Sequence, residues 1–304
     1  MDLLRHTLWF LICWLAGFLL ASLVIQLLAP MFGINDFTYL LEKIKEGEFL
    51  EHITTLKIIQ MLGHLCVYTI PPLLFANFLM RTKATSYLYL NTHLKLIDIP
   101  LIIGLFILAY PIAMWLYYIN MQLIPATWIA NDTLEVEMRM MEMKHPMDLI
   151  LNVLMLGVVA GVGEELLFRG VVQRLCMHYF KSIHSAIWVT ALLFSLIHFQ
   201  PEGFLPRFLL GALLGYVFLW TGSLWASILG HVTFNASQVA LFYILVDVNK
   251  VADPSKMPDF SILFSVLSVL IFIFIGYGLI RLNKNKGLEL TKYMVLPETA
   301  KLPF

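Results

Sequence analysis

The sequence of 304 residues has little charge: 13% of its residues are Asp, Glu, Lys or Arg, and 60% are hydrophobic. An average soluble domain carries about 25% charged residues. The sequence also has no net charge and no basic cluster interleaved with aromatic residues, which excludes a nucleic-acid-binding surface. We therefore expect an integral membrane protein with the lipid bilayer, and no nucleic acid, as a partner.

Cysteine and several hydrolase motifs are also scarce or missing. Cys13, Cys66 and Cys176 are odd in number and have no CxxC spacing, which excludes a disulfide framework and a cysteine metal site. There is no HExxH zinc motif and no GxSxG serine motif. Residues 161–164 approach a GxGD aspartyl motif, but the acidic residue is Glu164 and no second intramembrane Asp is present.

The chain contains long apolar runs in place of these features. A helix needs roughly 20 residues to cross the hydrocarbon core, and the first run is longer than the core of a cleavable signal peptide, so we expect it to be retained. Strand-like alternation is absent, so the predicted fold is an all-α polytopic bundle. The sequence predicts about eight transmembrane helices, near residues 7–29, 58–79, 97–119, 149–172, 183–199, 204–220, 223–246 and 261–280.

An even number of spans would place both termini on one side of the membrane. Lys and Arg are enriched in the segments on that side, which predicts cytoplasmic N and C termini. We divide the chain into N-terminal helices with two interfacial connectors (1–148), a core (149–246), and a last helix with a cytoplasmic tail (247–304). The expected location is a cell membrane, such as a bacterial inner membrane.

Polar residues inside the apolar runs are the strongest functional signal. An ionisable side chain at the membrane centre costs roughly 2.5–3.5 kcal/mol on insertion scales, so it usually marks a site that faces the protein interior. Three sets have i,i+4 spacing and hence share a helix face: Glu165 with Arg169, Phe194 with His198, and His231 with Asn235. Glu164 points about 100° away from Glu165, so the two carboxylates need not share a role.

These residue types suffice for peptide-bond hydrolysis. A buried glutamate suits a general base that activates water, imidazoles can share that water or polarise a carbonyl, and the Asn235 amide can stabilise an oxyanion. Two other functions use the same residues: a membrane transporter or immunity-type protein with a proton or ion relay, and a catalytically silent peptide-binding scaffold. The paired half-repeats with broken helices that mark many transporters are not evident.

The ordered set Glu164-Glu165-x-x-x-Arg169, Phe194-x-x-x-His198 and His231-x-x-x-Asn235 resembles the three motifs of the CPBP intramembrane proteases. That family includes the CAAX prenyl endopeptidases and bacteriocin-processing or Abi proteins, and the resemblance covers roughly residues 149–246. It implies that Glu164 activates water with help from His198, while His231 and Asn235 position or stabilise the oxyanion. Glu165 and Arg169 would orient the site, with Arg169 able to touch substrate, and Phe194 would pack or contact substrate.

The resemblance implies a peptide or membrane-protein substrate and leaves the cofactor open. Glu164, His198 and His231 are three possible ligands for a divalent metal such as zinc, with water as the fourth, and a metal-free glutamate mechanism uses the same residues. Either mechanism requires these three side chains to converge on one cavity.

Other polar and flexible residues receive structural interpretations. We expect His64 to make an interhelical hydrogen bond. For Glu202 and Arg207 we expect a surface ion pair, with gating of substrate entry as the alternative. The methionines at 138, 140, 141 and 143 are expected to pack at the surface or contact the lipid interface.

Overall fold

The computed structural model describes residues 2–48, 52–80, 83–129, 131–143, 145–245 and 262–284, and in these residues all regular structure is helical. The N-terminal elements are α1 (Asp2–Leu28), η1 (Ala29–Phe32), α2 (Phe37–Lys45), α3 (Ile53–His64), η3 (Leu65–Thr69), α4 (Ile70–Leu74), η4 (Phe75–Leu79), α5 (Ala84–Tyr87), α6 (Asp98–Leu123), η5 (Ala126–Trp128) and α7 (Asn131–Met141). The remaining elements are α8 (Pro146–Asn152), η6 (Val153–Val159), α9 (Ala160–Leu167), η7 (Phe168–Val172), α10 (Gln173–Phe180), α11 (Ile183–Leu196), η8 (Pro201–Gly203), α12 (Phe204–Thr221), α13 (Leu224–Leu245) and α14 (Ile262–Leu282).

The described residues confirm the predicted all-α membrane fold. Six helical stretches are long and apolar enough to cross a membrane: Leu3–Phe32, Ile53–Leu79, Asp98–Leu123, Pro146–Phe180, Pro201–Thr221 and Leu263–Leu282. The other two predicted spans are also helical, but α11 has only 14 residues, or about 21 Å. Helix α13 has 22 residues but carries His231 and Asn235. The count of eight crossings and the cytoplasmic side of the termini therefore stay predictions.

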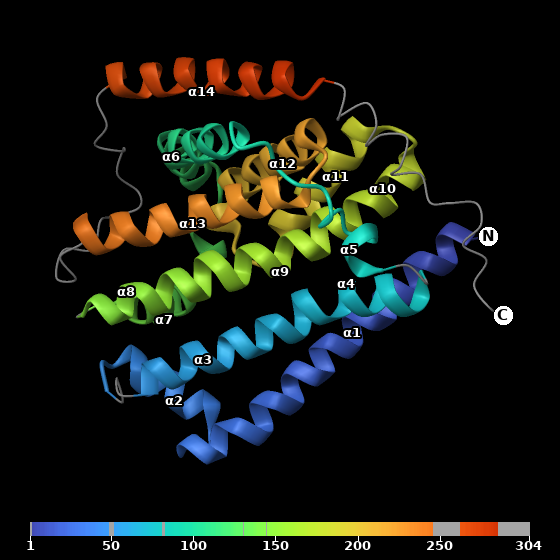
Figure 1. Cartoon of the computed structure of the whole chain (residues 1–304). Helices are drawn as coiled ribbons and strands as arrows, with labels where there is room; N and C mark the ends of the chain where they lie inside the picture. Colours follow the sequence, from blue (N-terminus) through green and yellow to red (C-terminus); the bar gives the residue numbers. More distant parts are fainter. Residues whose placement is uncertain are drawn as a thin grey trace.

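Helix α9 lies in the middle of the bundle, between α13 and the α3–η3 helix (Figure 1). Helix α1 packs outside α3, and α14 packs against α6 at the opposite edge. The two predicted connectors contain the short helices α2 and α7, which pack against each other. Side chains from α3, η3 and α13 therefore surround the central helix α9.

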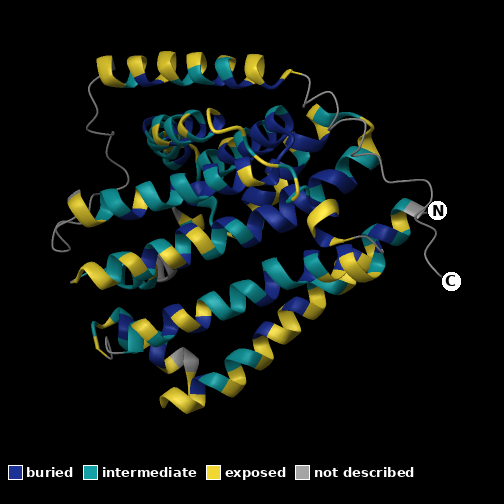
Figure 2. Cartoon of the chain, in the orientation of Figure 1, coloured by how far each residue is buried: buried dark blue, intermediate teal, exposed yellow. Residues whose placement is uncertain are grey.

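The exposure of side chains rises from the central helices to the outer ones (Figure 2). The outer helices α1 and α14 carry exposed apolar side chains such as Leu19 and Phe274, a pattern suited to contact with lipid. The centre is buried, and its largest apolar cluster includes Phe75, Leu167 and Phe168. The ionisable residues of α9 are therefore held inside protein rather than against lipid.

Local helix geometry allows the close packing around α9. The π-helical segments η6 and η7 flank it within the single long helix Pro146–Phe180, and π-helical turns occur frequently at functional sites. A Cβ atom added at Gly161 would lie 3.0 Å from Val232 Cγ2, and one at Gly163 would lie 2.9 Å from Thr69 Oγ1. Glycine is thus required for α9 to approach α13 on one side and η3 on the other.

Candidate active site

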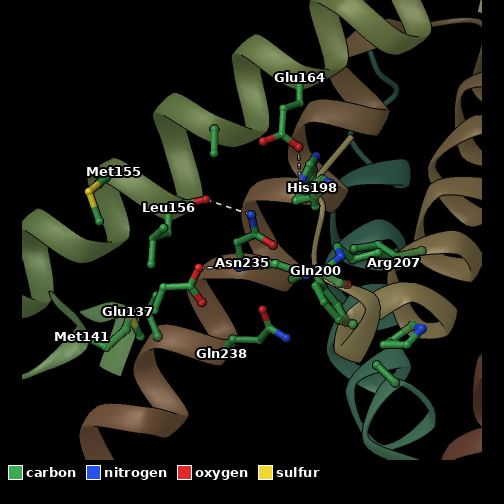
Figure 3. Close-up of a pocket in the computed structure, with 18 of the residues that line it drawn as sticks. Glu137, Met141, Met155, Leu156, Glu164, His198, Gln200, Arg207, Asn235 and Gln238 are labelled. Atoms are coloured by element: carbon green, nitrogen blue, oxygen red, sulfur yellow. Dashed lines mark hydrogen bonds and ion pairs between the residues drawn. The ribbon is translucent and has the colours of Figure 1, made fainter. Parts of the chain in front are cut away.

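A cavity of about 570 Å³ opens beside α9, lined by residues of α3, α6, α7, α12 and α13 (Figure 3). Five of the seven predicted site residues line it, namely Glu164, Phe194, His198, His231 and Asn235. Glu165 and Arg169 do not. The structure therefore brings together the three side chains whose convergence the hypothesis required.

Glu164 is the carboxylate on the cavity side of α9. It is 8% exposed, and it points into the same part of the cavity as His198 (Figure 3). Its Oε1 lies 3.2 Å from Nε2 of His64, and its Oε2 lies 3.9 Å from Nε2 of His231. The first contact is a hydrogen bond and the second is too long for one, so Oε2 remains available toward the cavity.

Glu165 points about 100° away from Glu164 around α9 and lies in a closed polar network. Its Oε1 accepts a hydrogen bond from Arg169 Nη1 at 2.5 Å and lies 2.8 Å from His231 Nδ1, while its Oε2 accepts one from Ser227 Oγ at 2.5 Å. Glu165 is 0% exposed. The predicted pairing with Arg169 is present, and protein groups occupy both carboxylate oxygens.

Arg169 is buried in the same network. Its Nη2 donates to the Gly211 carbonyl at 2.6 Å, and its guanidinium lies 5.0 Å from the centre of the Phe194 ring. With an exposed fraction of 0% and no place in the cavity wall, Arg169 has no surface that a substrate can reach in this structure. Its contacts are those of a residue that fixes α9 relative to α11 and α12.

The partners of two imidazoles define their tautomers. His198 Nδ1 lies 2.7 Å from the Phe194 carbonyl, which can only accept, and His231 Nδ1 faces the Glu165 carboxylate. Both rings therefore carry hydrogen on Nδ1, and in the neutral form each Nε2 has a free lone pair. His231 links the two glutamates, since its Nε2 faces Glu164.

Asn235 projects from α13 into the cavity wall. Its Nδ2 donates to the Leu156 carbonyl at 2.8 Å, a bond visible in Figure 3. Leu156 belongs to η6, so the π-helical segment supplies the acceptor that orients the amide. An amide nitrogen has two hydrogens, and one remains for another acceptor.

The far rim of the cavity contains a second polar chain. Glu137 of α7 accepts a hydrogen bond from Gln200 Nε2, and Gln200 Oε1 accepts one from Arg207 Nη1 at 2.9 Å. Partial burial raises the pKa of Glu137, against the opposing effect of the Gln200 hydrogen bond. Figure 3 shows these three residues away from Glu164, across the cavity.

Two structural interpretations are wrong at this rim. Glu202 is 3% exposed, and the amide of Asn120 binds the carbonyls of Pro201 and Glu202, so the predicted surface ion pair with Arg207 is absent. Arg207 instead lines the cavity and binds Gln200. Met140 and Met141 also line the cavity because α7 folds back over it, and their side chains are not confined to an outer surface.

His64 also lines the cavity, although its predicted role was structural. It does make an interhelical hydrogen bond as predicted, but its partner is Glu164. Gln60 precedes His64 by four residues and lines the same cavity, but this pair matches none of the three family motifs. Only the packing of α3 on α9 identifies it.

The possible metal ligands named from the sequence are Glu164, His198 and His231. Among the residues that the structure describes, no group of three His, Cys, Asp or Glu side chains is arranged to hold a metal ion. We derive no catalytic step through a metal.

The fold and cavity first define a class, a polytopic helical membrane protein with carboxylate, imidazole and amide groups around one internal cavity. The family follows from sequence comparison: residues 146–237 match the model of the type II CAAX prenyl endopeptidases of the Rce1-like family. This match supports the resemblance to the CPBP family of intramembrane proteases that the three motifs indicated. It includes all seven motif residues.

A Bacillus subtilis relative, the uncharacterized protein YpbD, is 30% identical over 92 residues. That alignment covers 28% of this chain and 42% of YpbD, so it spans less than half of the relative. No solved structure matches the chain. His64, which lies outside residues 146–237, is not part of the family match.

Proposed function

We propose that the protein is an intramembrane endopeptidase that hydrolyses peptide bonds of membrane-associated peptides or proteins, similar to a CAAX protease. The observation that carries the proposal is the position of Glu164. Its side chain lines a cavity of about 570 Å³ together with His198, His231 and Asn235, within the residues that match the Rce1-like family. A general base must reach both the water and the scissile carbonyl, and this wall offers the room for both.

Glu164 acts as the base in the proposed reaction. A water held between Glu164 and the bare Nε2 of His198 transfers a proton to Glu164, and its oxygen attacks the peptide carbonyl. The tetrahedral intermediate collapses when the C–N bond breaks, and Glu164 returns the proton to the leaving amine. Water is consumed, and one carboxylate and one amine are formed.

The developing oxyanion is stabilised from α13. The free N–H of Asn235 is one donor, and Nε2 of His231 is the other when that ring carries a second proton. Two carboxylates flank His231, at 2.8 Å from Nδ1 and 3.9 Å from Nε2. Preorganised donors of this kind typically contribute about 10²–10³-fold to the rate.

The proposed substrate is apolar near the scissile bond. Five methionines from four helical segments line the cavity together with Phe194, Leu210 and Phe234: Met61, Met114, Met140, Met141 and Met155. Methionine adapts its shape to varied apolar partners. Membrane-anchored peptides, including those with a prenylated C-terminal cysteine, are therefore the first substrates to test.

The test is cleavage of such peptides by the purified full-length chain in liposomes, with products identified by mass spectrometry. Glu164→Gln should lower kcat/KM by about 10²–10⁴-fold while peptide binding is retained. Glu46→Gln, at the exposed end of α2, serves as the matched control and should leave the rate unchanged.

Two results would contradict the proposal. Cleavage that survives Glu164→Gln would remove the base. Absence of cleavage, together with proton or ion flux that Glu164→Gln abolishes, would identify a relay instead of a protease.

A further inference from the structure

We propose that His64 of α3 is a positioning residue for Glu164: it donates a hydrogen bond to one carboxylate oxygen and so turns the other toward the cavity. This inference rests on the proposed function. His64 lies 100 residues before Glu164 in the sequence and outside the family-matched segment. The N-terminal helices would then complete the proposed catalytic centre rather than only surround it.

The surroundings of the His64 ring define the direction of this hydrogen bond. Nε2 lies 3.2 Å from Glu164 Oε1, whereas Nδ1 is buried and has no hydrogen-bond partner among the described residues. A neutral imidazole carries hydrogen on one nitrogen only. A carboxylate can only accept a hydrogen bond. The tautomer with hydrogen on Nε2 therefore leaves the fewest polar atoms without a partner, and in it Nε2 donates to Glu164.

This tautomer is the reverse of that in the other two cavity histidines. His198 and His231 both carry hydrogen on Nδ1, which leaves their Nε2 atoms toward the cavity. With all three rings neutral, only His64 donates from Nε2, and it does so to Oε1. The two oxygens of Glu164 are thereby made unequal. Oε1 accepts the hydrogen bond from His64, whereas the ion-pair partner of Oε2 is His231 Nε2 at 3.9 Å.

A fixed carboxylate matters for a general base. The proton-accepting oxygen must lie within hydrogen-bond reach of the water in a productive geometry, and a carboxylate with no partner rotates freely about its last bond. A hydrogen bond to a charged group also offsets part of the cost of burying that charge. His64 therefore contributes orientation without taking part in the transfer of a proton.

The fold positions His64 closely. It is the last residue of α3, directly before the π-helical η3, and its ring stacks on Tyr68 with centroids 4.3 Å apart. The absence of a side chain at Gly163 makes room for it, since a Cβ atom there would lie 3.0 Å from His64 Cε1. The glycine directly before the glutamate pair thus permits the contact that orients Glu164.

The test compares three variants of His64 in the full-length chain in liposomes, with the cleaved peptide of the previous section as substrate. His64→Gln keeps an N–H donor near the position of Nε2. His64→Phe keeps the ring that stacks on Tyr68 but has no donor, and His64→Asn keeps an amide that is too short to reach Oε1.

We expect His64→Phe and His64→Asn to lower kcat by about 10–100-fold, the loss of one hydrogen bond to a charged group, with KM within about twofold. His64→Gln should recover kcat to within about threefold of the unmodified chain. His184→Phe is the matched control and should leave kcat unchanged, because that ring binds Tyr216 between α11 and α12, outside the cavity.

The outcomes separate this inference from the proposed function. If the unmodified chain cleaves and Glu164→Gln does not, but His64→Phe or His64→Asn keeps full kcat, the positioning role is wrong and the function stands. Equal losses in His64→Gln and His64→Asn would also contradict a donor role. Should His64→Phe fail to fold, the ratio of kcat between the Gln and Asn variants decides the question alone.

Discussion

The two sides of helix α9 present the same residue type in opposite environments. On one side, protein donors at 2.5–2.8 Å occupy both oxygens of Glu165, which is 0% exposed. On the other, Glu164 has one hydrogen-bonded oxygen and a cavity before it. Neighbouring glutamates thus differ in environment because one residue of helix turns a side chain by about 100°.

The two carboxylates differ in how many of their oxygens are hydrogen-bonded to protein groups. A buried ion pair is tolerated when all its groups are hydrogen-bonded, and Glu165 with Arg169 approaches that state through Ser227, His231 and Gly211. The groups of this network have few free hydrogen-bonding positions for a substrate. His231 contacts both glutamates, so its bond to Glu165 also positions the ring that faces Glu164.

The largest expected effect comes from breaking the closed side. Arg169→Met leaves Glu165 without its cationic partner and should lower the free energy of unfolding by about 3–5 kcal/mol, the usual result of removing one member of a buried pair. Denaturant unfolding in detergent measures it. The double variant with Glu165→Gln, which removes the uncompensated charge, should recover part of the loss, and equal stability of the single variant and the unmodified chain would contradict a structural pair.

The next effect concerns the open side. Asn235→Ala removes the proposed oxyanion donor and should lower kcat by about 10²–10³-fold, or about 2.7–4 kcal/mol. Gln238→Ala is the matched control, because Gln238 lines the same cavity one turn further along α13. A loss of equal size in both variants would indicate damage to the cavity wall rather than loss of a donor.

A third variant tests the close contact between α9 and η3. Gly163→Ala would place a Cβ atom 2.9 Å from Thr69 Oγ1, closer than normal packing allows, and overpacking of this kind costs about 1–3 kcal/mol. Gly157→Ala is the control, since its nearest neighbour would be Ala236 Cβ at 3.6 Å, an ordinary contact. Thermal unfolding of the two proteins should differ, and equal melting temperatures would contradict the packing argument.

The smallest expected effect lies at the far rim. Glu137→Gln keeps an acceptor for Gln200 and should change kcat/KM by no more than about threefold, less than 1 kcal/mol. Peptide cleavage at neutral pH measures it. A loss approaching that of Glu164→Gln would mean that the second carboxylate of the cavity takes part in the reaction.

Much of the site could be predicted because its signals are local. The pair Glu165–Arg169 shares a helix face by spacing, and charged residues within apolar runs are rare enough to stand out. The eight apolar runs are helical for the same reason, since their length and composition are sequence properties.

The remaining features depend on tertiary packing. His64 belongs to none of the three motifs, and its contact with Glu164 is visible only where α3 meets α9. Glu202 was assigned to a surface from its loop, but Asn120 of α6 holds that loop inward. Met140 and Met141 were assigned to an outer face because an amphipathic helix does not reveal which surface it covers.

The most direct test of the account is a paired measurement on Glu164→Gln and Glu165→Gln, with peptide cleavage and unfolding free energy determined for each. The account predicts that Glu164→Gln loses about 10²–10⁴-fold in kcat/KM while its unfolding free energy stays within about 1 kcal/mol. Glu165→Gln should lose about 3–5 kcal/mol of stability, because Arg169 is left buried without a counter-charge. Full cleavage by Glu164→Gln, or unchanged stability of Glu165→Gln, would contradict the division between the two sides of α9.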